Sequence, residues 1–339
     1  MADIQKTPFV RELASSDRKI RDKALESLTL FLRSRTDLTL LDLLKLWKGL
    51  FFCFYHSDRP LTQQALARAL SSLVPSLPPS SVHRFLRAFW ITIGRDFHSL
   101  DRLRLDKYLF LIRCYVGVAF EIFVKNGGKG SGSKEANGDG KKRKREDAGK
   151  QGSRGKKHKK QAEGSTPATE QENDDDQKQS EDDAKWADLS AYIAIIEEGP
   201  LCPVNFDPDQ PSKPVADEED PNSVPMPHGP DGLRYHLIDL WVDELEKVLE
   251  FEELGDEGAE AENSDGEPVQ NRKIKGDVPI ELLLRPLEKL RTESPYKPLR
   301  TRAAEALDDD RLVEWGVRTR KVEEDEEESE QEWGGFGDD

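Results

Sequence analysis

The stretch Leu43–Leu73, LLKLWKGLFFCFYHSDRPLTQQALARALSSL, decides the fold because it holds two apolar helical stripes joined by a tight corner. Apolar residues recur at helical spacing in both halves: Leu43, Leu44, Trp47, Leu50, Phe51 and Phe54, then Leu61, Ala65, Leu66, Ala69, Leu70 and Leu73. Ser57–Pro60 breaks the pattern between them. We expect Asp58 to cap the second helix, and Pro60 fits its first turn, where no amide hydrogen is needed. Such a hairpin cannot bury both stripes alone, so other helices must cover it.

Similar amphipathic segments flank this hairpin on both sides, and no strand-period alternation of any length is present. The first part predicts six helices joined by short capped turns, over 7–13, 17–32, 40–55, 60–73, 80–93 and 101–125. We expect Ser16–Asp17 to cap the second of these helices and Asp101 to cap the sixth, and we expect Ser80 or Ser81 to open the fifth after a stop at Pro75, Pro78 and Pro79. After residue 185, further helices are predicted over 186–198, 233–249, 279–290, 300–307 and 311–315. We therefore predict an all-α fold, a HEAT- or armadillo-like α-solenoid of antiparallel helix pairs. A closed helix bundle is the alternative.

Charge divides the 339 residues unevenly. Residues 1–126 hold 20 Lys and Arg against 12 Asp and Glu, whereas residues 186–339 hold 16 against 42. The high charged fraction of 35% also indicates that part of the chain does not fold. We predict a basic helical-repeat domain at 1–126, a disordered linker at 127–185, C-terminal helices at 186–320 that pack on the solenoid around disordered stretches at 199–230 and 252–277, and a disordered acidic tail at 321–339.

Several classes of function have no support in the sequence. Cys53, Cys114 and Cys202 lie far apart, which favours a reducing compartment without a disulfide framework or a cysteine zinc site. No charged-then-apolar leader precedes the first helix, and the longest apolar run, 108–124, contains charged residues, so we expect neither secretion nor a membrane span. Nucleophile-elbow, zincin and Walker A motifs are absent. We therefore predict no catalytic residue, no cofactor, no metal ion and no small-molecule substrate.

Two basic clusters separated by ten residues have the layout of a bipartite nuclear import signal. Its members are Lys141, Lys142, Arg143, Lys144, Arg145, Lys156, Lys157, Lys159 and Lys160. An exposed run of this kind fits acidic grooves on a nuclear import receptor, which we predict as a partner. A plain solvated charge run is the alternative.

Basic residues also lie opposite the apolar stripes of the first helices. Neighbouring helices of a solenoid present one edge to the same side, so these residues are expected to form a strip suited to RNA or DNA phosphates or to a protein partner. The candidates are Lys45, Lys48, Arg59, Arg84, Arg87, Arg95, Arg102, Arg104, Lys107 and Arg113. Ordinary solvation, with Asp96, Asp101 and Asp106 as ion-pair partners, is the alternative. The acidic segments are expected to meet basic ribosomal or chromatin proteins, to screen the protein from nonspecific RNA, or only to raise solubility.

The first 126 residues resemble the nucleolar ribosomal-RNA-processing protein 1 family of eukaryotes. The blocks that carry the resemblance are TPFVRELA at Thr7–Ala14, KLWKGLF at Lys45–Phe51, SDRPLTQ at Ser57–Gln63, FWITI at Phe89–Ile93 and LDRLRLDKY at Leu100–Tyr108. The later helices near 186–196 and 233–249 resemble the second part of the family more loosely.

This resemblance implies a helical-repeat protein of the nucleus and nucleolus that carries no catalytic residues. It implies a role in maturation of the large ribosomal subunit, within early pre-60S particles and in processing of the large-subunit pre-rRNA. We therefore expect a non-catalytic scaffold whose partners are pre-rRNA, other assembly factors and ribosomal proteins. The competing hypotheses are a general nuclear adaptor for chromatin or transport, and an enzyme with a polar pocket among its helices.

Overall fold

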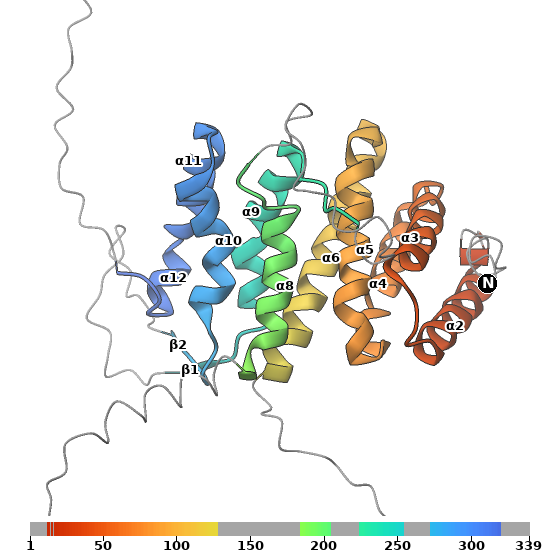
Figure 1. Ribbon diagram of the computed structural model, residues 1–339, viewed down its shortest axis with the longest axis horizontal. Helices are drawn as coiled ribbons and strands as arrows, with labels where there is room; N and C mark the ends of the chain where they lie inside the picture. The colour runs from red at the N-terminus through yellow and green to blue at the C-terminus, as the bar shows by residue number, and fades with distance from the viewer. Residues whose placement is uncertain are drawn as a thin grey trace, which may run out of the picture.

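In the computed structural model, helices stand side by side along the longest axis, from α2 at one end to α12 at the other (Figure 1). The structure describes residues 12, 13, 15, 17–127, 184–204, 224–253 and 272–319. The helices are α2 (Arg18–Ser34), α3 (Leu40–Tyr55), α4 (Pro60–Ser71), α5 (Pro79–Asp96), α6 (Arg102–Gly127), α8 (Ala187–Glu198), α9 (Asp231–Glu246), α10 (Ile280–Glu293), α11 (Lys297–Leu307) and α12 (Asp310–Glu314). Short 3-10 turns follow α4 and α5 at Val74–Ser76 and Phe97–Ser99. The prediction of an all-α fold is confirmed.

The helices pack in two rows. One row contains α3, α5, α8 and α10, and the other contains α4, α6, α9 and α11, each helix touching the next in its row. Consecutive helices alternate between the rows, and α3 with α4, α6 with α8 and α10 with α11 make contacts across them. This order is the one expected of stacked helix pairs, in which each pair buries its apolar faces against its neighbours.

Trp47 lies at the centre of the apolar packing in the first pairs. Its ring centroid on α3 is 5.3 Å from that of Phe85 and 4.9 Å from that of Phe89, both on α5. Tyr115 of α6 completes the group, 5.3 Å from Trp47 and stacked on Phe89 at 4.0 Å. Each fully buried ring contributes about 1.5–3 kcal/mol to folding, so this group ties three helices together. It belongs to a single apolar cluster that continues through the C-terminal helices.

Two predicted helix caps are present. Asp17 accepts a hydrogen bond from the backbone N–H of Lys19 at the start of α2. Asp101 accepts from the N–H groups of Leu103 and Arg104, both at 3.0 Å, at the start of α6. These carboxylates satisfy donors that have no partner within the helix, so both helices begin where the sequence indicates.

Two other predicted helix starts are wrong. The N-cap of α4 is Arg59, with no side-chain cap, because Asp58 turns instead toward Lys107, 3.4 Å away. Helix α5 begins at Pro79, whereas the sequence analysis expects Ser80 or Ser81 to open it. A proline fits the first turn of a helix as well as it ends a preceding segment, so Pro79 starts this helix rather than stopping the chain before it.

Helices on either side of the predicted linker pack directly against each other. Phe120 on α6 meets Trp241 on α9 edge to face, with ring centroids 4.9 Å apart. Phe123 on α6 stacks on Tyr192 of α8 at 5.2 Å. The proposed four-part division of the chain stays a prediction. Residues 128–183, with the predicted import signal, and residues 320–339, with the whole predicted acidic tail, lie outside the described residues.

A short antiparallel ladder, which the sequence analysis does not predict, joins α9 to α10. Strand β1 (Phe251–Glu253) pairs with β2 (Arg272–Ile274), with Phe251 opposite Ile274. Three residues are too few to show strand alternation, and Phe251 is held by a distant partner, the ring of Trp315 at 5.4 Å. The ends of the predicted disordered stretch 252–277 are therefore ordered, and residues 254–271 lie outside the described part. Within the described ranges, no helix combines the length and apolar character needed to cross a bilayer.

Candidate nucleic-acid interface

The exposed side of α3 carries both basic and apolar residues. Leu41, Lys45, Lys48, Phe52 and Tyr55 follow one another at steps of four and three, which places them along one helix face. Leu41 is 45% exposed and Phe52 is 46% exposed, although nine other residues of the same helix are buried. An aromatic ring held this far in solvent on an otherwise well-packed helix indicates a surface available to a partner.

Electrostatic contacts connect the cations and rings of this face. The Lys48 ammonium lies 5.0 Å from the centroid of the Phe52 ring and 3.0 Å from the Asp96 carboxylate of α5. The Arg104 guanidinium lies over the Tyr55 ring at 4.4 Å. These contacts hold the rings with cations beside them. We call this surface the basic–aromatic strip, and its members are Leu41, Lys45, Lys48, Phe52, Tyr55 and Arg104.

Asp101 fixes the end of the basic–aromatic strip at the corner between α3 and α6. Its carboxylate receives hydrogen bonds from Arg104 at 2.5 Å and from the Tyr55 hydroxyl at 3.2 Å. The Arg104 hydrogen bond lowers the pKa of the Asp101 carboxyl below its ordinary value, with Tyr55 adding to the effect. Asp101 is therefore ionised at neutral pH, and it orients both side chains while cancelling part of the positive charge.

Lys107 lies beneath this corner and supports it from inside. Its ammonium donates to the backbone carbonyls of Tyr55 at 2.7 Å and Ser57 at 2.8 Å, and the side chain is 3% exposed. Burial lowers its pKa, and the nearby Asp58 carboxylate opposes that shift. Lys107 thus satisfies carbonyls at the end of α3 that lack helical partners. A ligand on the surface cannot reach it without moving the corner.

Of the other predicted cations, three more are exposed near the basic–aromatic strip and three join helices. The exposed ones are Arg59, Arg95 and Arg102. Arg84 donates to the carbonyl of Leu38 at 2.7 Å, Arg87 forms two bonds of 2.7 and 2.8 Å with Glu198 of α8, and Arg113 pairs with Asp243 and Glu244 of α9. The structure therefore gathers part of the predicted set on one face. A nucleic-acid or partner-binding role for the ten residues stays a prediction.

The aromatic members of the basic–aromatic strip are absent from the sequence-based candidates. Phe52 and Tyr55 belong to the run FFCFY, in which Phe51 and Phe54 are buried. A signal was available, because Lys45, Lys48, Phe52 and Tyr55 repeat at helical spacing on the side opposite the buried stripe. Aromatic rings next to lysines are typical of surfaces on which nucleic-acid bases stack.

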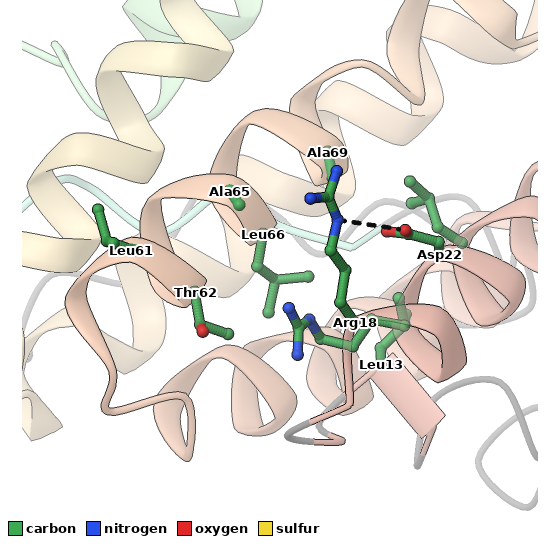
Figure 2. Close-up of a pocket in the computed structure, with 10 residues that line it drawn as sticks. Leu13, Arg18, Asp22, Leu61, Thr62, Ala65, Leu66 and Ala69 are labelled. Atoms are coloured by element: carbon green, nitrogen blue, oxygen red, sulfur yellow. Dashed lines mark ion pairs between the residues drawn. The ribbon is translucent and has the colours of Figure 1, made fainter.

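A groove also lies between α2 and α4. Figure 2 shows Leu61, Leu66, Ala65 and Ala69 of α4 facing Leu13 and the Arg18–Asp22 ion pair, around a cavity of about 450 Å³. The lining brings together no nucleophile with a base. In the ranges that the structure covers, no group of three His, Cys, Asp or Glu side chains is placed to hold a metal ion.

Helix pairs stacked in two rows, with a basic and aromatic outer face, define an all-α protein. The sequence profile of the family described as "Nucleolar protein, Nop52" matches residues 4–137 and 217–335. The chain belongs to this nucleolar protein family, which confirms the resemblance to the ribosomal-RNA-processing protein 1 family.

Relatives from several eukaryotes match about a quarter to a third of the chain. Human ribosomal RNA processing protein 1 homolog B is 40% identical over 132 residues, which are 37% of this chain and 17% of that protein. Human homolog A is 37% identical over 125 residues, 35% of this chain and 27% of the relative. The homolog from Dictyostelium discoideum is 33% identical over 89 residues, 26% and 18% of the two chains. The matched part thus spans about a quarter or less of these relatives.

Proposed function

We propose that this protein is a non-catalytic assembly factor in nucleolar biogenesis of the large (60S) ribosomal subunit. It acts as a scaffold within pre-60S particles and promotes processing of the large-subunit pre-rRNA, alongside other assembly factors and ribosomal proteins. The family is nucleolar by its description, and the relatives are named for processing of ribosomal RNA. The predicted import signal at Lys141–Lys160 supplies the route into the nucleus.

The basic–aromatic strip is the observation that carries this proposal. The exposed Phe52 ring offers a stacking platform for an unpaired base, next to the Tyr55 ring that Arg104 covers. Base stacking on an aromatic ring is worth about 1–3 kcal/mol per base. Lys45, Lys48 and Arg104 lie between or beside these rings and neutralise phosphates. A single-stranded segment of pre-rRNA would therefore lie along α3.

The packing of α3 explains how this surface could hold RNA in a fixed position. Its opposite face is anchored by Trp47 and the rings of α5 and α6, so the exposed side chains project from a fixed helix. An RNA segment held on such a surface cannot pair elsewhere until it is released. Catalysis by nucleases of the particle would depend on that positioning, without a reactive group from this chain.

Binding of single-stranded RNA by the full chain tests the proposal. A fluorescent oligonucleotide of about 12 nucleotides, titrated at low salt, should lose at least tenfold in affinity with Lys45→Glu combined with Phe52→Ala, because a phosphate contact and a stacking platform are removed. Both side chains are exposed, so folding should survive. Lys23→Glu on exposed α2 is the matched control for charge. Equal affinity of the double variant and the control would refute RNA binding by this surface.

A further inference from the structure

We propose that the acidic segment Glu323–Asp339 of this same chain docks on the basic–aromatic strip and competes with RNA for it. The competition rests on the proposed function, whereas the docking itself does not. The segment would act as an internal mimic of single-stranded nucleic acid, which restrains binding to weak or incorrect RNA.

The charges and aromatic rings of the segment complement those of the basic–aromatic strip. Its 17 residues include ten Asp and Glu and no Lys or Arg, and they end in EWGGFGDD, with Trp333 and Phe336 among the carboxylates. Carboxylates replace phosphates as partners of lysine and arginine, and the indole and phenyl rings replace bases. Cation–aromatic contacts of the kind that Lys48 and Arg104 already make are available to both incoming rings.

The surface of α3 has a positive excess for such a segment. Six cations lie on or beside the basic–aromatic strip, and three carboxylates touch them: Asp58, Asp96 and Asp101. The cations are Lys45, Lys48, Arg59, Arg95, Arg102 and Arg104. Lys45 and Arg102 are exposed, so an incoming carboxylate can reach them without displacing a neighbouring helix.

The rest of the molecule directs the segment toward α3. Residues 186–319 hold 14 Lys and Arg against 32 Asp and Glu, whereas residues 1–126 carry a net charge of +8. An acidic segment attached to the negative half is repelled by its own neighbours and attracted by the other half. At physiological salt this effect acts over about 8 Å, so it becomes decisive once the segment approaches the first helices.

The chain is long enough to make this contact. Arg318 donates to Glu288 of α10, which places the end of the described chain beside that helix. Helices α10, α8, α5 and α3 follow one another in the same row, and packed helices are about 8–10 Å apart. The separation across the row is therefore roughly 24–30 Å. Fourteen residues join Thr319 to Trp333 and span up to about 46–50 Å when extended. The extended segment is therefore longer than this separation, and the excess length allows it to shift along the helix axes.

Two measurements test the docking and the competition separately. First, a fluorescein-labelled peptide of residues 320–339 is titrated with a chain that lacks 322–339, a deletion that removes no described residue. Binding should weaken at least fivefold with Lys45→Glu plus Phe52→Ala and remain unchanged with the Lys23→Glu control. Second, RNA affinity is compared between the full chain and the deleted chain. A tether gives an effective concentration on the order of 1 mM, so a peptide with a dissociation constant of about 100 µM predicts about tenfold tighter RNA binding after deletion.

Each outcome has a distinct meaning. Peptide binding that depends on the strip, without any RNA binding, would refute the proposed function and support the docking. RNA binding that depends on the strip, unchanged by the deletion and with no peptide binding at 50 mM salt, would overturn the docking and leave the proposed function intact. A gain in RNA affinity that grows with protein concentration would assign the contact to a second copy and overturn the intramolecular proposal. Trp333→Ala in the full chain should reproduce part of the gain.

Discussion

Arg113 of α6 and Glu244 of α9 form an ion pair across the junction between the first and the last helices. The distance from Arg113 Nε to Glu244 Oε1 is 2.5 Å, and Lys247 Nζ lies 2.6 Å from the same oxygen. Gly117 makes room for the pair, because a β-carbon at that position would lie only 2.7 Å from Glu244 Oε2. The carboxylate is buried, so its two cations are essential to its stability there.

Replacement of Gly117 by alanine should therefore destabilise the protein, against the usual preference of helices. Alanine in a helix interior gains about 1 kcal/mol over glycine, but its methyl group would push the buried Glu244 away from Arg113. Loss of a buried pair costs about 3–5 kcal/mol. Because Arg113 is itself partly exposed, we expect a net loss of roughly 1–2 kcal/mol in the free energy of unfolding, measured by urea denaturation.

Gly232 supplies the matched control for this substitution. It lies in the first turn of α9, and a β-carbon there would meet the Phe97 ring at 3.5 Å, an ordinary contact distance. Gly232→Ala should therefore be neutral or slightly stabilising. If both glycine substitutions stabilise the protein equally, the Arg113–Glu244 pair does not restrict the space at Gly117.

The helices and most of their buried faces could be predicted because the evidence for them is local, whereas Leu61 of the second predicted apolar stripe is 83% exposed. In α3, the apolar spacing that begins at Leu43 identifies residues that the structure buries. The predicted caps at Asp17 and Asp101 depend on donors two or three residues away. In each case the burial or the hydrogen bond depends on spacing along one segment, so a single sequence contains the information.

The partners of the predicted cations could not be found in this way. The sequence predicts Arg87 to be a solvent-facing basic residue on a polar helix face. In the structure it pairs with Glu198, 111 positions further along the chain. Arg113 and Glu244 are separated by 131 positions. Only the stacking of α8 on α5 and of α9 on α6 brings these charges together, and helical periodicity carries no information about which charged faces meet.

The neighbouring acidic residues Glu197 and Glu198 should differ in importance, although both hold α8. Glu197 is 9% exposed and receives hydrogen bonds from Arg285 and Lys289 of α10, both at 2.6 Å. Glu198 is 47% exposed and pairs with Arg87. We expect Glu197→Gln to cost about 2–3 kcal/mol and Glu198→Gln to cost less than about 1 kcal/mol. Chemical denaturation of the two variants makes the comparison, and equal costs would contradict the difference in burial.

Alkaline pH should unfold the protein through buried acids in its core. Burial raises the pKa of the Cys53 thiol to about 12, and it raises the pKa values of Tyr108 and Tyr115 above their ordinary range. Since these pKa values are raised in the folded state, the stability of the folded protein is unaffected by these groups below pH 9.0 for Cys and 10.0 for Tyr, their pKa values in the unfolded chain. Stability is lost as pH rises above these values. Each titrating group then lowers the free energy of unfolding by about 1.4 kcal/mol per pH unit.

Urea denaturation between pH 7 and 11 measures this effect. Stability should fall from about pH 9 onward, where Cys53 and Cys114 begin to lose their protons in the unfolded chain, because burial raises the pKa of both thiols in the folded state. Cys53→Ala should make the fall between pH 9 and 10 shallower, and the tyrosines should add to it above pH 10. Tyrosinate absorbance near 295 nm should show part of the tyrosine signal only when unfolding occurs. A stability profile that is flat to pH 11 would show that these groups are not buried in solution.

Asp101→Asn should tighten the binding of RNA and of the acidic peptide to the basic–aromatic strip. The Asp101 carboxylate is ionised at neutral pH, and the Arg104 hydrogen bond lowers its pKa further, so Asp101 competes with any incoming anion for that guanidinium. Asparagine caps a helix as well as aspartate does, so α6 should still begin at Arg102. The substitution therefore frees Arg104 for a phosphate, and the slope of log affinity against log salt should steepen by about 0.7 for single-stranded RNA. Affinities measured between 50 and 200 mM salt decide the point. Weaker binding with an unchanged thermal midpoint would mean that Asp101 serves the strip by orienting Arg104 and Tyr55, not by opposing their charge.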